Sequence, residues 1–284
     1  NNQSMYRKDM FKAKRKALEE IWSGETLGIA DDPFSNYSFK YTPIEYDDDP
    51  MELKETDIRF DSWRNMDAWE NEDCRNYLIG RGITKESSKS MGFMYTDLNW
   101  FNGVRYEKRL LIPVYEGGHL LSMEGRTICG AKPKVLYPKD STTQTLFDID
   151  HLDRNKTLFA LEGLMDLAVL RGCEVFRNST SIFGASLTRR QIELLKDFQE
   201  KGIVYINDND RAGENTIMML KQSGLRNIRV LSPPSRLNGM EVKDIGDLPK
   251  VGCTVDSLVD RNWFNYMVPL SEYRFRYQED EDDD

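Results

Sequence analysis

Acidic side chains stand at points in this sequence where strands are predicted to end, and their spacing suits the binding of a cation. Glu162 and Asp166 interrupt the apolar stretch LFALEGLMDLAVL, which spans 158–170. Residues four apart lie on one face of a helix. Burying two carboxylates among apolar residues is costly unless a cation or hydrogen bonds compensate. Taken alone, such a pair is most often part of a solvated helix face.

Two further acidic pairs follow later predicted strands. Asp208 and Asp210 come directly after IVYI, and Asp244 and Asp247 follow the next strand and a Pro-Pro loop. A pair of this kind is most often a turn, but two residues apart in extended chain point to the same side. Ligands of open parallel sheets bind beyond the carboxyl ends of the strands. Carboxylates gathered there fit Mg²⁺ (or Mn²⁺) and favour phosphoryl or nucleotidyl transfer.

The elements that must position these acids alternate between strand and helix, which predicts βαβ units and a parallel sheet. Before them, the pattern predicts two helices and then a hairpin that turns at Gly117-Gly118, with Thr84 capping the second helix. The predicted strands are 104–115, 119–128, 158–161, 203–206 and 228–231, and the predicted helices are 66–79, 84–92, 163–171, 187–198 and 212–222.

Composition limits the class of protein. The chain has 284 residues, of which 39% are hydrophobic and 31% charged, a balance typical of one large or two small globular domains. No run of 18 apolar residues occurs, which argues against a membrane partner. The four cysteines are scattered without a CxxC pair, so a structural zinc site is not indicated and reduced thiols in the cytoplasm are expected.

The two ends of the chain carry charge patterns. The net charge is −9, and the unbroken acidic run 279–284 contributes six of these charges, so a local basic groove remains compatible with the body. Residues 5–22 are predicted to form an amphipathic helix whose basic face is either solvated or binds nucleic acid or a partner. The segment 273–277 (YRFRY) is typical of an edge strand or of a base-stacking surface. The lack of an initiator Met suggests a fragment.

Seven segments, in order, resemble the DnaG-type primases of bacteria and bacteriophages. LFALEGLMDLAVLRG followed by VYINDNDRAGENT resembles the TOPRIM signature of a Glu-Gly and a later Asp-x-Asp. VKDIGDL resembles the third acidic motif, although Ile-Gly separates its acids. The other similar segments are NYLIGRGIT (76–84), RLLIPVYEGGHLLSMEGR (109–126), KPKVLYP (132–138, with Val135 where the family has Tyr) and FGASLTRRQIELLK (183–196).

The resemblance implies a fold and roles for particular residues. It implies a TOPRIM domain, a short parallel sheet flanked by helices, over 156–250. A mixed α+β primase subdomain over 58–155 precedes it, with a helix and acidic connector over 1–57 and a C-terminal segment over 251–284. Glu162 is expected to be the general base or an electrostatic organiser. The expected metal site is formed by Glu162, Asp166, Asp208, Asp210 and Asp244, and the expected nucleotide or DNA contacts are Arg81, Arg109, Arg126, Lys132 and Lys134.

The resemblance implies a cytoplasmic RNA polymerase that makes short primers on a single-stranded DNA template. Its substrates would be ribonucleoside triphosphates, its cofactor Mg²⁺ (or Mn²⁺) and its protein partner a replicative helicase. Two alternatives use the same scaffold: a TOPRIM-family nuclease, and a non-catalytic TOPRIM protein that binds DNA or partners. The primase-like segment before Glu162 argues against the nuclease, and retention of all five acids argues against the scaffold. For each basic residue, a surface cation or a structural ion pair is the alternative.

Overall fold

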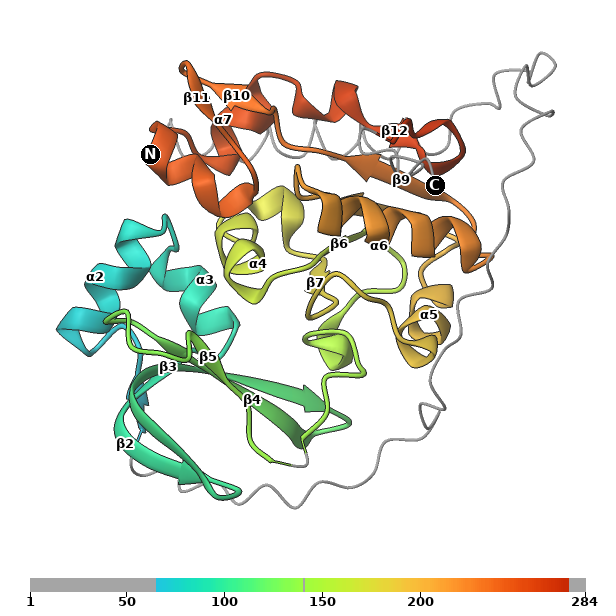
Figure 1. Ribbon diagram of the computed structural model, residues 1–284. Coiled ribbons are helices and arrows are strands. Elements are labelled where there is room, and N and C mark those ends of the chain that lie inside the picture. The colour runs from blue at the N-terminus through green and yellow to red at the C-terminus, as the bar shows by residue number, and fades with distance from the viewer. Residues whose placement is uncertain (1–64, 140, 276–284) are drawn as a thin grey trace, which may run out of the picture. The chain divides into compact units, whose positions relative to one another are not determined.

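A computed structural model describes residues 65–139 and 141–275, all within one compact unit that spans 50–284 (Figure 1). The predicted helix over 5–22, the connector and the acidic run lie outside the described residues. The helices are α2 (Glu72–Gly80), α3 (Lys85–Ser90), α4 (Leu164–Leu170), α5 (Arg189–Lys196), α6 (Arg211–Gln222) and α7 (Val255–Asp260). Short 3-10 helices are η2 (Ile149–His151), η3 (Glu174–Phe176), η4 (Ile245–Val251), η5 (Trp263–Tyr266) and η6 (Leu270–Glu272).

The strands form two five-stranded sheets and a small hairpin. The first sheet has the order β1-β2-β3-β4-β5, the second has the order β12-β9-β8-β6-β7, and β10 pairs with β11. The strands are β1 (Asn65–Asp67), β2 (Met94–Phe101), β3 (Val104–Glu116), β4 (His119–Thr127), β5 (Val135–Leu136), β6 (Leu158–Leu161), β7 (Ser179–Ser181), β8 (Ile203–Ile206), β9 (Ile228–Leu231), β10 (Arg236–Leu237), β11 (Met240–Glu241) and β12 (Val268–Pro269).

The first sheet is antiparallel and contains the predicted hairpin as β3 and β4. Gly117 and Gly118 both have positive φ at its turn, a conformation that glycine adopts without steric cost. Their N–H groups donate to the Asp150 carboxylate at 2.8 and 3.1 Å, which ties the turn to the chain that leads into the second sheet. One face of the sheet buries Phe101, Tyr106 and neighbouring apolar residues as a core.

The predicted helix over 66–79 is wrong at its N-terminal end. Met66 lies in β1, where it pairs with Tyr95 of β2, a strand that the sequence pattern did not predict. The helix begins at Glu72 because Asn71 caps it, its side chain accepting a hydrogen bond from the Cys74 N–H at 2.9 Å. The predicted cap at Thr84 is confirmed, since its hydroxyl accepts from the Ser87 N–H at 3.1 Å.

The second sheet is the predicted parallel sheet, with β6, β7, β8 and β9 parallel to one another and β12 antiparallel at the edge. The predicted bounds of β6, β8 and β9 agree with the structure, because each is a short run of apolar residues that is largely buried. Of the two alternatives for 273–277, the edge strand is wrong for 273–275, which form no strand; β12 is the edge strand beside β9. Residues 276 and 277 lie outside the described residues.

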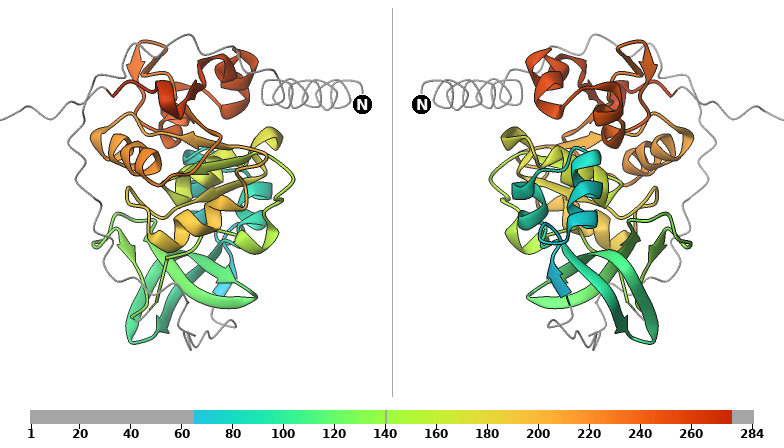
Figure 2. Two further views of the ribbon diagram at one scale, coloured as in Figure 1. Left: turned by 90° about the vertical axis from the view of Figure 1, so that its right-hand side faces the viewer. Right: turned by 90° about the vertical axis from the view of Figure 1, so that its left-hand side faces the viewer.

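The two sheets form separate layers in both views of Figure 2. They are joined near α3 and α4, where the Ser87 hydroxyl donates to the Ala168 carbonyl. Gly82 lies so close to η4 that a Cβ there would meet the Pro249 ring at 2.5 Å. The antiparallel part therefore contacts the parallel part beside α4, which contains Asp166, and η4, which Asp244 directly precedes. None of the described helices has the length and apolar composition needed to cross a membrane.

Candidate active site

The predicted acids lie at the carboxyl ends of neighbouring strands. Glu162 directly follows β6, Asp208 is two residues beyond β8, and Asp244 follows the β10–β11 hairpin that continues from β9. Because β6, β8 and β9 are parallel neighbours, their ends meet at one edge of the sheet. The acids at this edge, Glu162, Asp166, Asp208, Asp210 and Asp244, are called the acidic cluster below.

Glu162 is held by hydroxyl groups from β8 and α6. Its Oε1 accepts a hydrogen bond from Tyr205 Oη of β8 at 3.0 Å and from Thr216 Oγ1 of α6 at 3.4 Å. Burial raises the pKa of Glu162, although these hydrogen bonds act to lower it. A carboxylate with a raised pKa and a fixed orientation is suited to act as a proton acceptor.

Asp166 occupies a space that two glycines leave open. Its Oδ1 accepts a hydrogen bond from the Gly246 N–H at 2.8 Å, which joins α4 to η4. A Cβ at Gly163 would lie 2.6 Å from Asp166 Oδ2, and a Cβ at Gly246 would lie 2.5 Å from Asp166 Oδ1. Burial and the neighbouring Asp244 raise the pKa of Asp166 to about 6. The Glu-Gly and Ile-Gly pairs of the sequence therefore have a steric function.

Asp208 has the most strongly perturbed pKa of the acidic cluster. Burial, and then the charges of Asp166, Glu162, Asp244 and Asp210, raise its pKa to about 8. Its environment includes all four other acids, although they belong to three separate stretches of sequence. Like charges brought together at a low-dielectric site favour the protonated form of one of them unless a cation compensates.

Asn209 holds the loop that carries Asp208 and Asp210 close to the segment that leads into Asp244. Its side-chain Nδ2 donates to the carbonyls of Pro233 and Val242 at 2.9 and 3.1 Å, and its N–H donates to the Lys243 carbonyl at 2.7 Å. These three bonds clamp the loop after β8 to the segment that leads into Asp244. The residue between the two predicted metal-binding acids is thus a positioning residue.

Asp210 differs from the other acids. It is the N-cap of α6, where its Oδ1 accepts from the Gly213 N–H at 2.9 Å, and its Oδ2 pairs with Lys243 Nζ at 2.7 Å. Although burial acts to raise it, the hydrogen bond from Lys243 holds the pKa of Asp210 below its usual range. Asp247 is engaged in the same segment, since its Oδ2 accepts from the Lys243 N–H at 2.9 Å.

Two of the predicted arginines act on the acidic cluster from the antiparallel part of the chain. Arg126 of β4 and Arg81 at the end of α2 both favour the charged form of Asp166 through their positive charge. Arg126 also forms an ion pair with Glu124 at 3.0 Å, with both side chains largely buried. Arg81 stacks over the Tyr77 ring at 5.1 Å. Arg126 therefore forms the structural ion pair that was the alternative to a phosphate contact. Its positive charge also favours the ionised form of Asp166.

The other predicted cations are placed differently. Arg109 is only 4% exposed, and its guanidinium donates to the carbonyls of Gly125 and Pro133 at 2.9 Å each. Its donors hold the backbone on either side of 126–132, so we correct its expected role from phosphate contact to support. Lys132 and Lys134 are exposed in the segment between β4 and β5, and neither forms an ion pair within the described residues.

The donor set fits a hard divalent cation. Among residues 65–139 and 141–275, no three histidine, cysteine, aspartate or glutamate side chains are arranged closely enough to hold a metal jointly. Mg²⁺ usually takes only one or two carboxylates and keeps water or phosphate oxygens as its other ligands. Asp208 and Asp166, whose pKa values are raised first by burial and then by neighbouring acids, are the carboxylates that such an ion would stabilise most.

Several residues of this site were missed by the sequence analysis. Lys243 pairs with Asp210, Tyr205 and Thr216 hold Glu162, and Asn209 clamps the loops. A signal existed for Lys243, which lies within the third acidic motif, directly before Asp244. None existed for Tyr205, because an aromatic residue in a buried strand is indistinguishable by type from an ordinary core residue.

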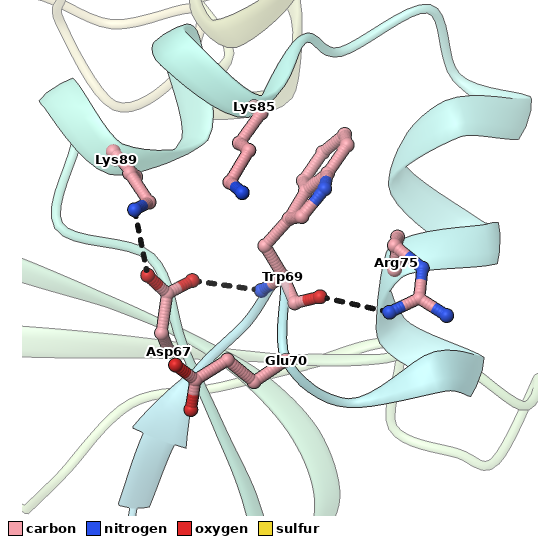
Figure 3. A pocket seen from close by; sticks show the side chains of 6 residues that line it. All are labelled: Asp67, Trp69, Glu70, Arg75, Lys85 and Lys89. Atoms are coloured by element: carbon pink, nitrogen blue, oxygen red, sulfur yellow. Dashed lines mark hydrogen bonds and ion pairs between the residues drawn. The ribbon is translucent and has the colours of Figure 1, made fainter.

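A small pocket in the antiparallel part is separate from this site. Asp67, Trp69, Glu70, Arg75, Lys85 and Lys89 line it (Figure 3). Lys89 points toward Asp67 at 3.8 Å, and Arg75 Nη1 donates to the Trp69 carbonyl at 3.2 Å. These contacts join β1, α2 and α3. Asp67, Arg75 and Lys89 therefore have structural partners, and no ligand is needed to explain their charges.

Replacing Gly246 with alanine should disrupt the acidic cluster while leaving the fold intact. The added Cβ would meet Asp166 Oδ1 and, at 3.3 Å, Asp244 Oδ1, so the carboxylates must move apart. We expect Mg²⁺ binding, measured by calorimetry, to weaken about tenfold or more, since misplaced ligand partners typically cost 10–100-fold. Gly80→Ala is the control, because a Cβ at Gly80 would meet no atom within 4 Å. Equal Mg²⁺ affinities for the two variants would contradict the idea that Gly246 leaves the space that Asp166 occupies.

Comparisons with known proteins agree with this geometry. Residues 159–246 match the family model described as Toprim-like. The DNA primase of Pseudomonas aeruginosa is 23% identical over 193 residues, which cover 54% of this chain and 29% of that protein. The chain thus spans less than a third of the length of this curated relative.

Solved primase structures share the fold. The zinc-binding and RNA polymerase domains of the Aquifex aeolicus primase match with a TM-score of 0.55 and 21% identity, covering 70% of this chain and 57% of that one. A DnaG primase catalytic domain bound to single-stranded DNA matches with a TM-score of 0.55 and 17% identity, covering 72% and 75%. This chain therefore has the fold of the DnaG-type primase catalytic core, with a Toprim-like domain that carries the acidic cluster.

Proposed function

We propose that this chain is the RNA polymerase core of a DNA primase, which makes short RNA primers on single-stranded DNA by metal-dependent nucleotidyl transfer. The observation that carries the proposal is the placement of Glu162, Asp166, Asp208, Asp210 and Asp244 at the carboxyl edge of the parallel sheet, where burial and the neighbouring acids raise the pKa of Asp208. The likeness to primase catalytic cores supports it. We expect a cytoplasmic protein that acts with a replicative helicase.

The reaction would join the 3′-hydroxyl of one nucleotide to the α-phosphorus of an incoming ribonucleoside triphosphate, releasing pyrophosphate. A divalent cation held by Asp208, with Asp166, Asp210 and Asp244 in support, would neutralise charge on the transferred phosphate. Glu162 would accept the proton of the attacking hydroxyl, because burial raises its pKa and Tyr205 fixes its orientation.

The arginines beside the acids would bind the triphosphate or the template backbone. Arg126 and Arg81 bring positive charge to the edge where Asp166 lies, and a planar guanidinium matches phosphate geometry. Lys132 and Lys134, exposed on the segment after β4, would contact phosphates farther from the reacting atoms.

The test is incorporation of labelled ribonucleotides by the full 284-residue chain. Mixed-sequence single-stranded DNA serves as template, with Mg²⁺, with Mn²⁺ or with a chelator. A second template carries an annealed RNA primer, so that a chain unable to initiate can still reveal extension. Metal-dependent incorporation on either template supports the proposal. Degradation of labelled DNA without incorporation would favour a nuclease, and binding without either reaction would favour a scaffold; both results reject a polymerase.

Removing a cation that neutralises a DNA phosphate should weaken DNA binding and flatten its salt dependence. We expect Lys134→Ala and Arg126→Ala each to lower the slope of log affinity against log salt by about 0.7, the value for one phosphate of a single strand. Fluorescence anisotropy of a labelled oligonucleotide measures both quantities, and melting curves confirm that Arg126→Ala remains folded. Lys201→Ala is the matched control, because Lys201 is exposed at the opposite end of β8. Unchanged slopes in both variants would refute the phosphate-binding role.

A further inference from the structure

A second cleft, of about 780 Å³, is left unused by the proposed reaction. The segment after β9, α7 and the last described residues line it, and these parts are orange to red in Figure 1. Three of its lining side chains are arginines, Arg236, Arg261 and Arg274, so we call it the arginine cleft.

The arginine cleft concentrates positive charge in an acidic protein. All three arginines are exposed, and within the described residues none of them forms an ion pair. Glu272 is the one acid among the lining residues. Guanidinium groups that line a cleft without carboxylate partners are suited to bind phosphate or carboxylate groups.

The cleft also presents aromatic surface. Tyr266 is 69% exposed, which is unusual for so large an apolar ring, and Tyr273 lines the cleft as well. Trp263 is buried beneath, where its Nε1 donates to the Ser232 carbonyl at 2.8 Å and fixes η5 against the segment after β9. An exposed ring on a rigid support beside arginines is the arrangement that stacks the bases of single-stranded nucleic acid.

Hydrogen bonds connect the walls of the arginine cleft to the neighbours of the acidic cluster. The Pro233 carbonyl accepts from Nδ2 of Asn209, the residue between Asp208 and Asp210. Tyr273 Oη contacts Nδ2 of Asn207, the residue before Asp208, at 3.4 Å. A strand of nucleic acid that leaves the acidic cluster on this side would therefore meet the cleft.

We infer that the arginine cleft binds a single-stranded segment of nucleic acid continuous with the strand at the acidic cluster. Arg236, Arg261 and Arg274 would hold its phosphates, and a base would stack on Tyr266. The inference rests on the proposed function for the nature of the substrate alone. The acidic run 279–284 of the sequence is the other anionic candidate, but its carboxylates would make no use of the exposed Tyr266 ring.

The test measures binding of a labelled oligothymidylate to the full chain, without nucleotides or metal, over a range of salt concentrations. Arg261→Ala and Arg236→Ala should each reduce the salt slope by about 0.7. Tyr266→Ala should weaken binding about fivefold or more and leave the slope unchanged, because stacking involves no counterion release. Matched controls are Arg226→Ala, exposed before β9, and Tyr115→Ala, 40% exposed at the end of β3.

A photoreactive oligonucleotide containing 4-thiothymidine locates the binding site. Cross-linking to the peptide that contains Tyr266, together with the slope changes, supports the inference. No cross-link and wild-type affinity in the arginine variants would overturn it, as would equal losses of affinity in the two controls; a cleft reserved for residues 279–284 would give the former result. If the folded chain makes no primers, the proposed function is refuted, but the binding and cross-linking results still decide whether the arginine cleft binds nucleic acid. Failure of the proposed function and failure of this inference are therefore distinguishable.

Discussion

Asp208→Asn is expected to reduce primer synthesis at least about a hundredfold, the scale on which a group that stabilises transition-state charge contributes to rate. The same substitution should leave the metal-free melting temperature unchanged or raise it. Burial and the charges of the four neighbouring acids raise the pKa of Asp208 to about 8, so an uncharged amide of the same size removes both the cost of burying a charge and the repulsion. Incorporation of labelled nucleotide in Mg²⁺ and thermal melting in a chelator measure the two effects.

Asp197→Asn is the matched control for this substitution. Asp197 follows α5, is half-exposed and pairs with Arg154 at 3.2 Å. The chemical change is the same, but an exposed ion pair contributes only about 0–1 kcal/mol to stability and lies outside the acidic cluster. Full activity in Asp208→Asn, or equal losses of activity in both variants, would contradict the role given to Asp208.

The dependence of stability on pH gives an independent measure of the cost of ionising Asp208 in the folded chain. The pKa of Asp208 is about 8 in the folded chain against an ordinary value of 3.8, so the folded state holds a proton that the unfolded state has released. Its contribution to stability is complete below about pH 4 and is lost as the pH rises through 8. The metal-free melting temperature should therefore fall between about pH 6 and 8, and fall less in Asp208→Asn. Identical pH profiles would mean that Asp208 is not protonated in this range.

The parallel sheet could be predicted from the sequence because its strands are buried on both faces. Runs such as LFAL and IVYI are short, wholly apolar and bounded by turn residues. Both the residue types and the lengths of these runs therefore indicate buried strands. The strand β7, with the sequence STS, escaped prediction because its residues are polar. They are buried only because partners exist elsewhere: Thr180 Oγ1 donates to the Phe147 carbonyl at 2.8 Å, and Ser181 Oγ donates to the Glu162 carbonyl at 2.6 Å.

The acidic residues of the site could be predicted by type, but their environments could not. Carboxylates after strands mark an edge of a sheet, which is a local property of the sequence. The pairing of Asp210 with Lys243, by contrast, depends on how the β10–β11 hairpin folds back toward α6. Arg109 illustrates the opposite error, since a basic residue with an expected phosphate contact donates instead to the carbonyl groups of Gly125 in β4 and Pro133 just before β5.

Glu162→Gln is expected to lower the rate of nucleotide incorporation at least about a hundredfold, the usual contribution of a positioned general base. Glutamine has the same size, and its amide oxygen can accept the hydrogen bonds that Tyr205 and Thr216 donate to Glu162, so the site should keep its shape. What the substitution removes is the ability to take up a proton and the negative charge. Single-turnover incorporation measures the loss of rate, and oligonucleotide anisotropy should show unchanged DNA binding.

The Tyr205→Phe variant distinguishes whether Glu162 acts as a general base or only organises the site. This variant keeps the carboxylate but removes the hydroxyl that donates to Glu162 Oε1 at 3.0 Å and acts to lower its pKa. If Glu162 is the base, the pH at which the rate rises to half its maximum should move upward, because a carboxyl without that hydrogen bond to its charged form holds its proton to a higher pH. If Glu162 serves only to organise the site, Glu162→Gln should remain within a few-fold of the wild-type rate, and Tyr205→Phe should leave the pH profile unmoved.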